Sequence, residues 1–138
     1  MNRNARRLSR LFAKSEKGQA LVETALVLML LLLLFGGIVE FGRILQASLT
    51  VTAASREGAR VGILGKTDDE IKEVVKTAAG TLDPDKLQID IAPPAADRKR
   101  GESLTVEVKY PVEIVIPIIS AIIPGPFDVY GRTVMRME

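Results

Sequence analysis

The side chains that most often carry catalysis are missing from this sequence. It contains no His and no Cys, which excludes thiolate chemistry, zinc sites of the usual kind and Ser–His or Cys–His pairs. Its carboxylates are scattered without a defined spacing, and no glycine-rich phosphate loop is present. The sequence therefore predicts a protein that is not an enzyme, with no catalytic residues, no metal site, no cofactor and no small-molecule substrate.

One carboxylate stands out by its position. Glu23 is the single charged residue in the apolar run from Ala20 to Val39. A carboxylate in such a helix raises the free energy of membrane insertion by on the order of 2.5–3.5 kcal/mol at the middle of a bilayer, and by less near its surface. Glu23 therefore needs a partner or a function, or else its side chain reaches back to the headgroups. From the residues alone both alternatives stay open.

The apolar run itself predicts a membrane span. As an α-helix it is about 30 Å long, which matches the hydrocarbon core of a bilayer. A buried core helix is one alternative, but the rest of the chain has too little apolar mass to surround it. A secretory signal is another, but its apolar core has roughly 7–15 residues, and no A-x-A cleavage site follows this run.

The charge distribution predicts the orientation of the span. Residues 1–18 carry six basic side chains and one acidic side chain, whereas residues 19–138 carry 13 basic and 16 acidic ones. Positive charge beside a span keeps that side in the cytoplasm. We therefore expect a single-pass protein of the inner (cytoplasmic) membrane, with a cytoplasmic N-terminus and an extracytoplasmic C-terminal domain. A DNA-binding tail is the alternative for these arginines, but no basic stripe continues beyond them, and nucleic acid is not an expected partner.

The helical pattern continues past the apolar run. From Phe41 onward apolar residues recur at helical spacing, until two glycines within four residues mark an end. We expect one continuous helix from about Gln19 to about Gly62. The predicted organisation is a basic leader at 1–18, a long helix at 19–64 with its transmembrane part at about 20–39, and an extracytoplasmic domain at 65–138.

The pattern after the helix is typical of an α+β domain. Thr67 and Glu70 have the spacing of a capping box, which predicts a short helix over about 68–79. Alternating apolar residues predict three strands, at about 86–91, 103–116 and 127–137. Pro111 lies within the second strand and indicates a bulge or an edge position. We expect a small antiparallel sheet of three or four strands packed on the long helix, because so short a domain needs the helix to complete its core.

Two connections differ in character. The loop from Ala92 to Gly101 is polar, and its three consecutive basic residues are expected to be a solvated loop tip. The connection from Pro117 to Pro126 is apolar instead. It could form a helical turn packed into the sheet, or an exposed lip that touches the membrane or a partner.

The segment from Lys17 to Arg60 resembles the N-terminal signature of the TadE-like proteins, which are minor pilin or pseudopilin components of Tad (Flp, type IVb) pilus systems. Three pieces carry the resemblance, in this order: GQALVE, EFGR and REGAR. The resemblance implies a type IV pilin-like fold and a prepilin peptidase that cuts between Gly18 and Gln19. Glu23 would then be the fifth residue of the mature chain and would neutralise the N-terminal amine of an adjacent subunit. The implied partners are the membrane, the peptidase, other pilin or pseudopilin subunits and the assembly platform.

The REGAR piece allows two interpretations. Arg56, Glu57, Gly58 and Arg60 form either a solvated face or docking point of the helix, or a contact with another subunit. For the whole protein we expect a structural subunit, a minor pilin or pseudopilin that acts in pilus initiation or assembly. The alternative is an unprocessed single-span anchor with an extracytoplasmic binding or scaffolding domain.

Overall fold

The computed structural model describes the backbone of residues 3–137 and the side chains of residues 18–137 except that of Ile122. The basic side chains expected to face the cytoplasm before Gly18 lie outside the described side chains. The chain divides into two compact units, residues 1–38 and residues 39–138.

A single helix, α1 (Arg3–Gly62), contributes to both units. It begins well before the expected start at Gln19, because residues 3–17 are rich in Ala, Arg, Leu, Lys and Glu and contain neither Gly nor Pro. Its end at Gly62 is as predicted. A turn follows, in which Gly65 has φ +81°, a conformation that glycine adopts without steric cost.

The second helix, α2 (Asp68–Ala78), begins at the predicted capping box. The Thr67 hydroxyl accepts from the backbone N–H of Glu70, and the Glu70 carboxylate accepts from the backbone N–H of Thr67. Ile71 and Val75 are the buried residues of this helix.

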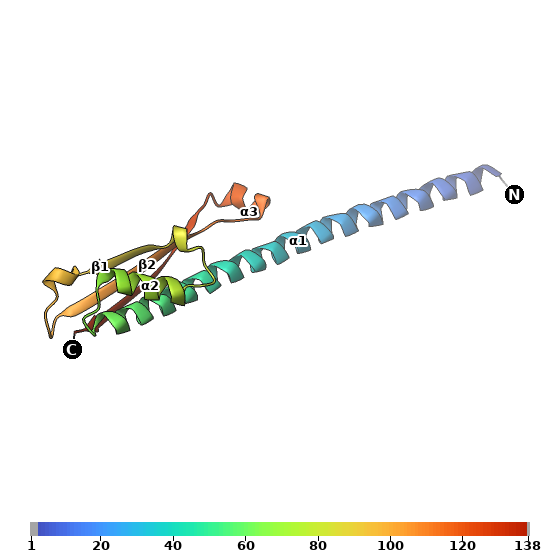
Figure 1. Ribbon diagram of the computed structural model, residues 1–138. Helices are drawn as coiled ribbons and strands as arrows, with labels where there is room; N and C mark the ends of the chain where they lie inside the picture. Colours follow the sequence, from blue (N-terminus) through green and yellow to red (C-terminus); the bar gives the residue numbers. More distant parts are fainter. Residues whose placement is uncertain (1–2, 138) are drawn as a thin grey trace. The chain divides into compact units, whose positions relative to one another are not determined.

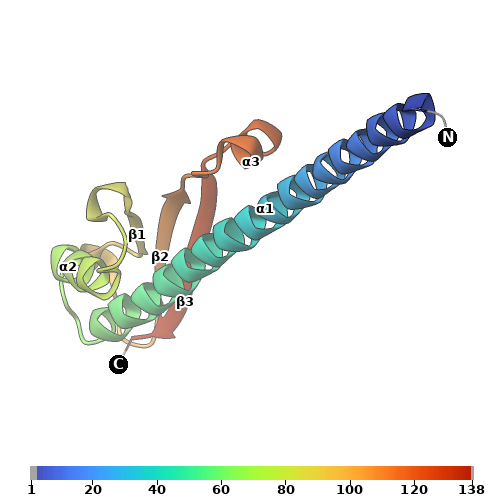
Figure 2. The ribbon, with the colours of Figure 1, turned by 90° about the vertical axis from the view of Figure 1, so that its right-hand side faces the viewer.

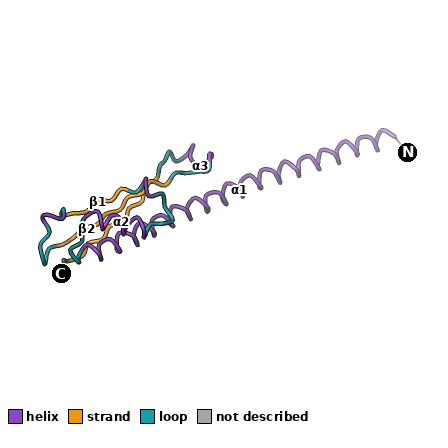
Figure 3. Tube along the Cα trace, viewed as in Figure 1, coloured by secondary structure: helices purple, strands orange, loops and turns teal. Residues whose placement is uncertain are grey.

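The sheet has three antiparallel strands in the order β1-β2-β3. Figure 3 draws the strands in orange and the helices in purple. The bounds of the strands are β1 (Gln88–Ala92), β2 (Ser103–Val112) and β3 (Phe127–Arg136). β1 begins later than expected because the preceding residues Pro84–Lys86 form a 3-10 turn. Pro111 lies on the central strand but beyond the end of β1, so β2 is locally an edge there and loses no ladder bond to β1.

The core of residues 39–138 lies between the helices and one face of the sheet (Figure 1). α1 supplies four small or branched side chains to it, and the inward residues of β2 face them. The fully buried core residues include Val51 and Ala54 of α1, Ile71 and Val75 of α2, and Leu104, Val106 and Val108 of β2. The fold is therefore α+β with the sheet packed on the long helix, as the sequence predicts.

The two connections carry short helical segments. A 3-10 turn at Ala95–Asp97 lies between β1 and β2, and α3 (Pro117–Ile122) lies between β2 and β3. Val115, Ile118 and Ile123 stay more than half exposed. Of the two alternatives for this connection, the structure has the exposed lip.

Candidate functional site

The expected processing site lies on α1. Gly18 and Gln19 are both exposed, and a side chain built on Gly18 would meet no atom within 4 Å. Glu23 is exposed as well and follows Gln19 by four residues, which places the two side chains on one helical face. These three residues belong to the unit of residues 1–38, whereas the REGAR residues belong to the other unit.

Large apolar side chains are exposed along α1 from Leu21 to Val39. The helix is long and apolar enough to cross a membrane, with a mean hydropathy of 2.5 in its most apolar window and 6% of that window buried. A core helix of a folded protein would have most of these side chains covered. The single apolar N-terminal helix therefore suggests a single-pass membrane protein.

The EFGR piece forms a polar clamp at the end of this apolar run. Oε1 of Glu40 accepts from the backbone N–H groups of Val115 and Ile116, at 2.7 and 2.9 Å. Its Oε2 accepts from Nη1 of Arg43 at 2.8 Å, and the same guanidinium donates to the Glu113 carbonyl at 3.3 Å. We call these contacts between α1 and residues 113–116 the Glu40 clamp.

The Glu40 clamp explains why β2 is shorter than predicted. The amides of Val115 and Ile116 bond to a carboxylate of α1, so they are not available to continue a strand. Glu40 is only 4% exposed, yet both of its oxygens have donors. The sequence offered one signal for this role, a carboxylate directly after an apolar run with Arg three residues later.

The REGAR piece has two faces in the structure. Arg60 donates to Glu57 at 2.9 Å in an exposed pair, and Arg56 is exposed as well. Gly58 is buried instead, and a Cβ built there would lie 2.5 Å from Cγ2 of Val75 on α2. The glycine therefore allows α2 to approach α1 closely, while the charged residues face outward.

A hydrogen bond between two hydroxyls joins α1 to the last strand. Ser55 is fully buried, and its hydroxyl lies 2.8 Å from that of Thr133 and donates to the Thr52 carbonyl at 2.9 Å. The bond satisfies the buried hydroxyl of Ser55 and favours one register of the helix on the sheet.

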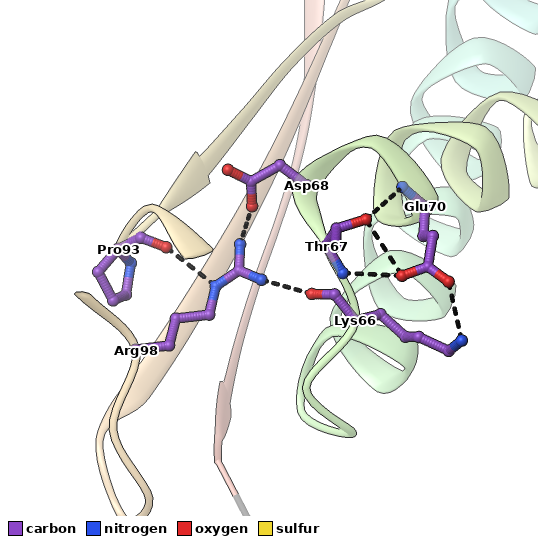
Figure 4. Close-up of polar contacts among 6 residues, drawn as sticks. All are labelled: Lys66, Thr67, Asp68, Glu70, Pro93 and Arg98. Carbon is purple, nitrogen blue, oxygen red and sulfur yellow. Dashed lines mark hydrogen bonds and ion pairs between the residues drawn. The ribbon is translucent and has the colours of Figure 1, made fainter. Parts of the chain in front are cut away.

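The prediction of a solvated basic loop tip is wrong for Arg98. Its side chain is 4% exposed and forms an ion pair with Asp68 at the start of α2. The same guanidinium donates to the carbonyls of Lys66 and Pro93, at 2.7 and 3.1 Å (Figure 4). The loop folds back on the α1–α2 connection because a planar guanidinium can serve several acceptors at once. Lys99 and Arg100 are exposed, as predicted.

Among residues 18–137, no group of three or more acidic side chains is placed to hold a metal ion. The polar contacts described above join elements of the fold to one another. Their role in this structure is to position those elements.

The comparisons with known proteins bear on the helix that carries these motifs. Residues 18–60 match the family model of TadE-like proteins. The matched segment begins at Gly18, ends at Arg60 and contains all three pieces of the signature, so the resemblance is confirmed. The match covers less than a third of the chain, and this segment is similar to that of proteins associated with Tad pili. Comparison with curated proteins and with solved structures found no match.

Proposed function

We propose that this protein is a minor pilin or pseudopilin of a Tad (Flp, type IVb) pilus system and that it acts in pilus initiation or assembly. The observation that carries the proposal is the TadE-like match over residues 18–60, on a helix whose apolar side chains are exposed. The second half of the same helix is part of a folded core. A pilus subunit needs both properties, a helix that packs beside other helices and a domain that is displayed.

In this proposal, residues 20–39 are held by lipid before assembly and by neighbouring helices afterwards. The basic leader at 1–18 stays in the cytoplasm of the inner membrane, and residues 65–138 fold outside it. A prepilin peptidase removes the leader between Gly18 and Gln19. Glu23 then pairs with the N-terminal amine of an adjacent subunit, and the exposed side chains of Arg56, Glu57 and Arg60 remain available for subunit contacts.

N-terminal mass spectrometry of the membrane-extracted protein tests the proposal. We expect a mature chain that starts at Gln19 in cells with a prepilin peptidase and an intact leader in cells without it. Gly18→Val should block cleavage, because a branched side chain hinders the close approach of a peptidase to the backbone. Gly37→Val is the matched control on the same helix, since a side chain there also meets nothing within 4 Å.

A leader that stays intact in the presence of the peptidase would refute processing and support the alternative, an unprocessed membrane anchor with an extracytoplasmic binding domain.

A further inference from the structure

The connection around α3 is an apolar lobe, which we define as residues 114–127. It contains no ionisable side chain. Val115, Ile118 and Ile123 are between 51% and 66% exposed. Its single hydroxyl, that of Ser120, donates to the Pro117 carbonyl of the same short helix at 2.9 Å. The described surface of the lobe thus offers little to a polar partner.

The Glu40 clamp determines where the lobe lies. Val115 and Ile116 bond directly to Glu40, which follows the last residue of the apolar run, Val39. Neighbouring residues of a helix differ in height by about 1.5 Å. If residues 20–39 cross the membrane, the base of the lobe therefore lies at the membrane surface, whatever the orientation of the rest of the domain. Figure 2 shows α3 beyond the ends of β2 and β3 rather than over the sheet.

The charges at the borders of the lobe are neutralised. Glu113 precedes it and pairs with Lys86 at 2.9 Å, and Asp128 follows it and pairs with Lys109 at 2.8 Å. An unpaired carboxylate at this level would oppose insertion, because burying an unpaired charge in an apolar environment is unfavourable. Both acidic neighbours instead form an ion pair with a lysine.

We propose that the apolar lobe inserts into the membrane interface, in the leaflet from which α1 emerges. The partner of the lobe is lipid, because the clamp places the lobe at the bilayer surface and the lobe has exposed aliphatic side chains without charge. The lobe and the span then form two points of attachment, which restrict rotation of the protein about the axis of the span. The inference depends on the span and not on cleavage or pilus assembly.

Fluorescence from single cysteines tests this contact, because the natural chain contains no Cys. The full-length protein carrying Ile118→Cys is labelled with the environment-sensitive dye NBD and placed in vesicles of phosphatidylcholine and phosphatidylglycerol. We expect blue-shifted emission that is quenched by nitroxide-labelled lipids, more strongly by a nitroxide near the headgroup than by one at the chain end. The depth should be that of an interfacial element, about 5–10 Å. Val115→Cys is a second position in the lobe and should behave alike.

Two matched positions complete the experiment. Leu64→Cys is the control for an exposed apolar residue, 67% exposed at the other end of the folded unit, and should not be quenched. Leu30→Cys reports the span and should be quenched most by the nitroxide at the chain end.

The contrary outcomes are distinguishable. Quenching at Leu30 but not at the lobe would overturn the inference and leave the span intact. A blue shift at the lobe that depends on the protein-to-lipid ratio and not on the nitroxide would assign the lobe to another protein chain, and would also overturn it. Absence of quenching at Leu30 would refute the span together with the contact.

Discussion

At the scale of single residues, Glu70 is the most heavily bonded carboxylate on the surface of the domain. Its oxygens accept from Nζ of Lys66 at 2.8 Å and from the backbone N–H and hydroxyl of Thr67. These bonds, that from Lys66 first, lower the pKa of Glu70 from 4.5 to about 2. The folded state thus favours the charged form more than the unfolded state does.

The lowered pKa of Glu70 predicts a pH dependence of stability. Its contribution should be complete above pH 4.5 and should be lost as the pH falls from 4.5 to about 2. Glu70→Gln keeps the acceptor for Thr67 and removes the charge. We expect the difference in Tm between the natural protein and this variant, measured by circular dichroism in detergent, to be largest near neutral pH and to vanish near pH 2.

Glu73→Gln on the same helix is the control. Its carboxylate makes one longer contact, 3.5 Å to Lys76, and we expect a smaller difference. A Tm difference for Glu70→Gln that does not change with pH would contradict the prediction.

Gly131 lies where β3 and α1 approach each other closely. A Cβ at this position would lie 2.3 Å from the Val51 carbonyl oxygen and 2.6 Å from the Thr52 nitrogen, which are backbone atoms and cannot rotate away. Gly131→Ala should therefore destabilise the protein by about 1–3 kcal/mol, as overpacking of a core does. Denaturant unfolding in detergent measures this change.

The matched control for Gly131→Ala is Gly42→Ala, because a side chain at Gly42 meets nothing within 4 Å. Replacing such a glycine by alanine stabilises a helix by up to about 1 kcal/mol. Equal effects of the two variants would refute the close contact between β3 and α1.

At the scale of elements, Arg98 holds the β1–β2 loop against the start of α2. Arg98→Met keeps much of the apolar volume but removes the donors for the carbonyls of Lys66 and Pro93 and the partner of Asp68. We expect a loss of about 1–3 kcal/mol in the free energy of unfolding, because partly buried acceptors lose their donors. The measurement is denaturant unfolding.

Arg100→Met, two residues away and exposed, is the comparison for Arg98→Met and should change the free energy of unfolding by less than about 0.5 kcal/mol. Similar effects of the two variants would mean that the loop tip is solvated after all.

The Glu40 clamp is the second contact between distant elements. Glu40→Ala removes the acceptor for the amides of Val115 and Ile116. We expect both amides to exchange with deuterium at least about tenfold faster, because they then open without unfolding of the core. Hydrogen exchange with mass spectrometry measures this rate. Glu57→Ala, which removes an exposed carboxylate of the same helix, should leave the exchange at residues 113–116 unchanged.

At the scale of the whole molecule, the two halves of α1 lie in different environments. Before Val39 its apolar side chains are exposed, and after it Ala47, Val51, Ala54 and Ala59 are buried in the core. The core of the domain includes these residues of α1. A membrane or protein that binds the exposed half of the helix therefore also anchors the domain. This arrangement is the one expected of the pilus subunit proposed above.

Glu23 is the charged exception in the exposed half and gives the prediction for assembly. Glu23→Ala should leave membrane insertion intact, because it removes a charge from an apolar helix. It should reduce the amount of other pilus subunits that co-purifies in mild detergent, because their N-terminal amine loses its proposed partner. Quantitative mass spectrometry of the purified complex measures the effect. Unchanged recovery of those subunits would contradict the pairing role.

Several elements could be predicted because their signals are local. The apolar run, the end of α1 at Gly62, the Thr67–Glu70 capping box and the alternation within β2 and β3 each depend on residues a few positions apart. The roles of Gly18, Gln19 and Glu23 also rest on a local motif and stay predictions. The helix over residues 3–17 differs from the predicted basic leader, because these residues combine positive charge with high helix propensity.

The amino-acid sequence by itself determined which segments are helical, extended or apolar enough for lipid, since those properties arise between near neighbours in the chain. Only the tertiary structure decided which polar groups are buried. Glu40 meets the amides of Val115 and Ile116 across 75 and 76 positions, and Arg98 meets Asp68 across 30. Such pairs form only after the chain has reversed direction, so no periodicity within a segment records them.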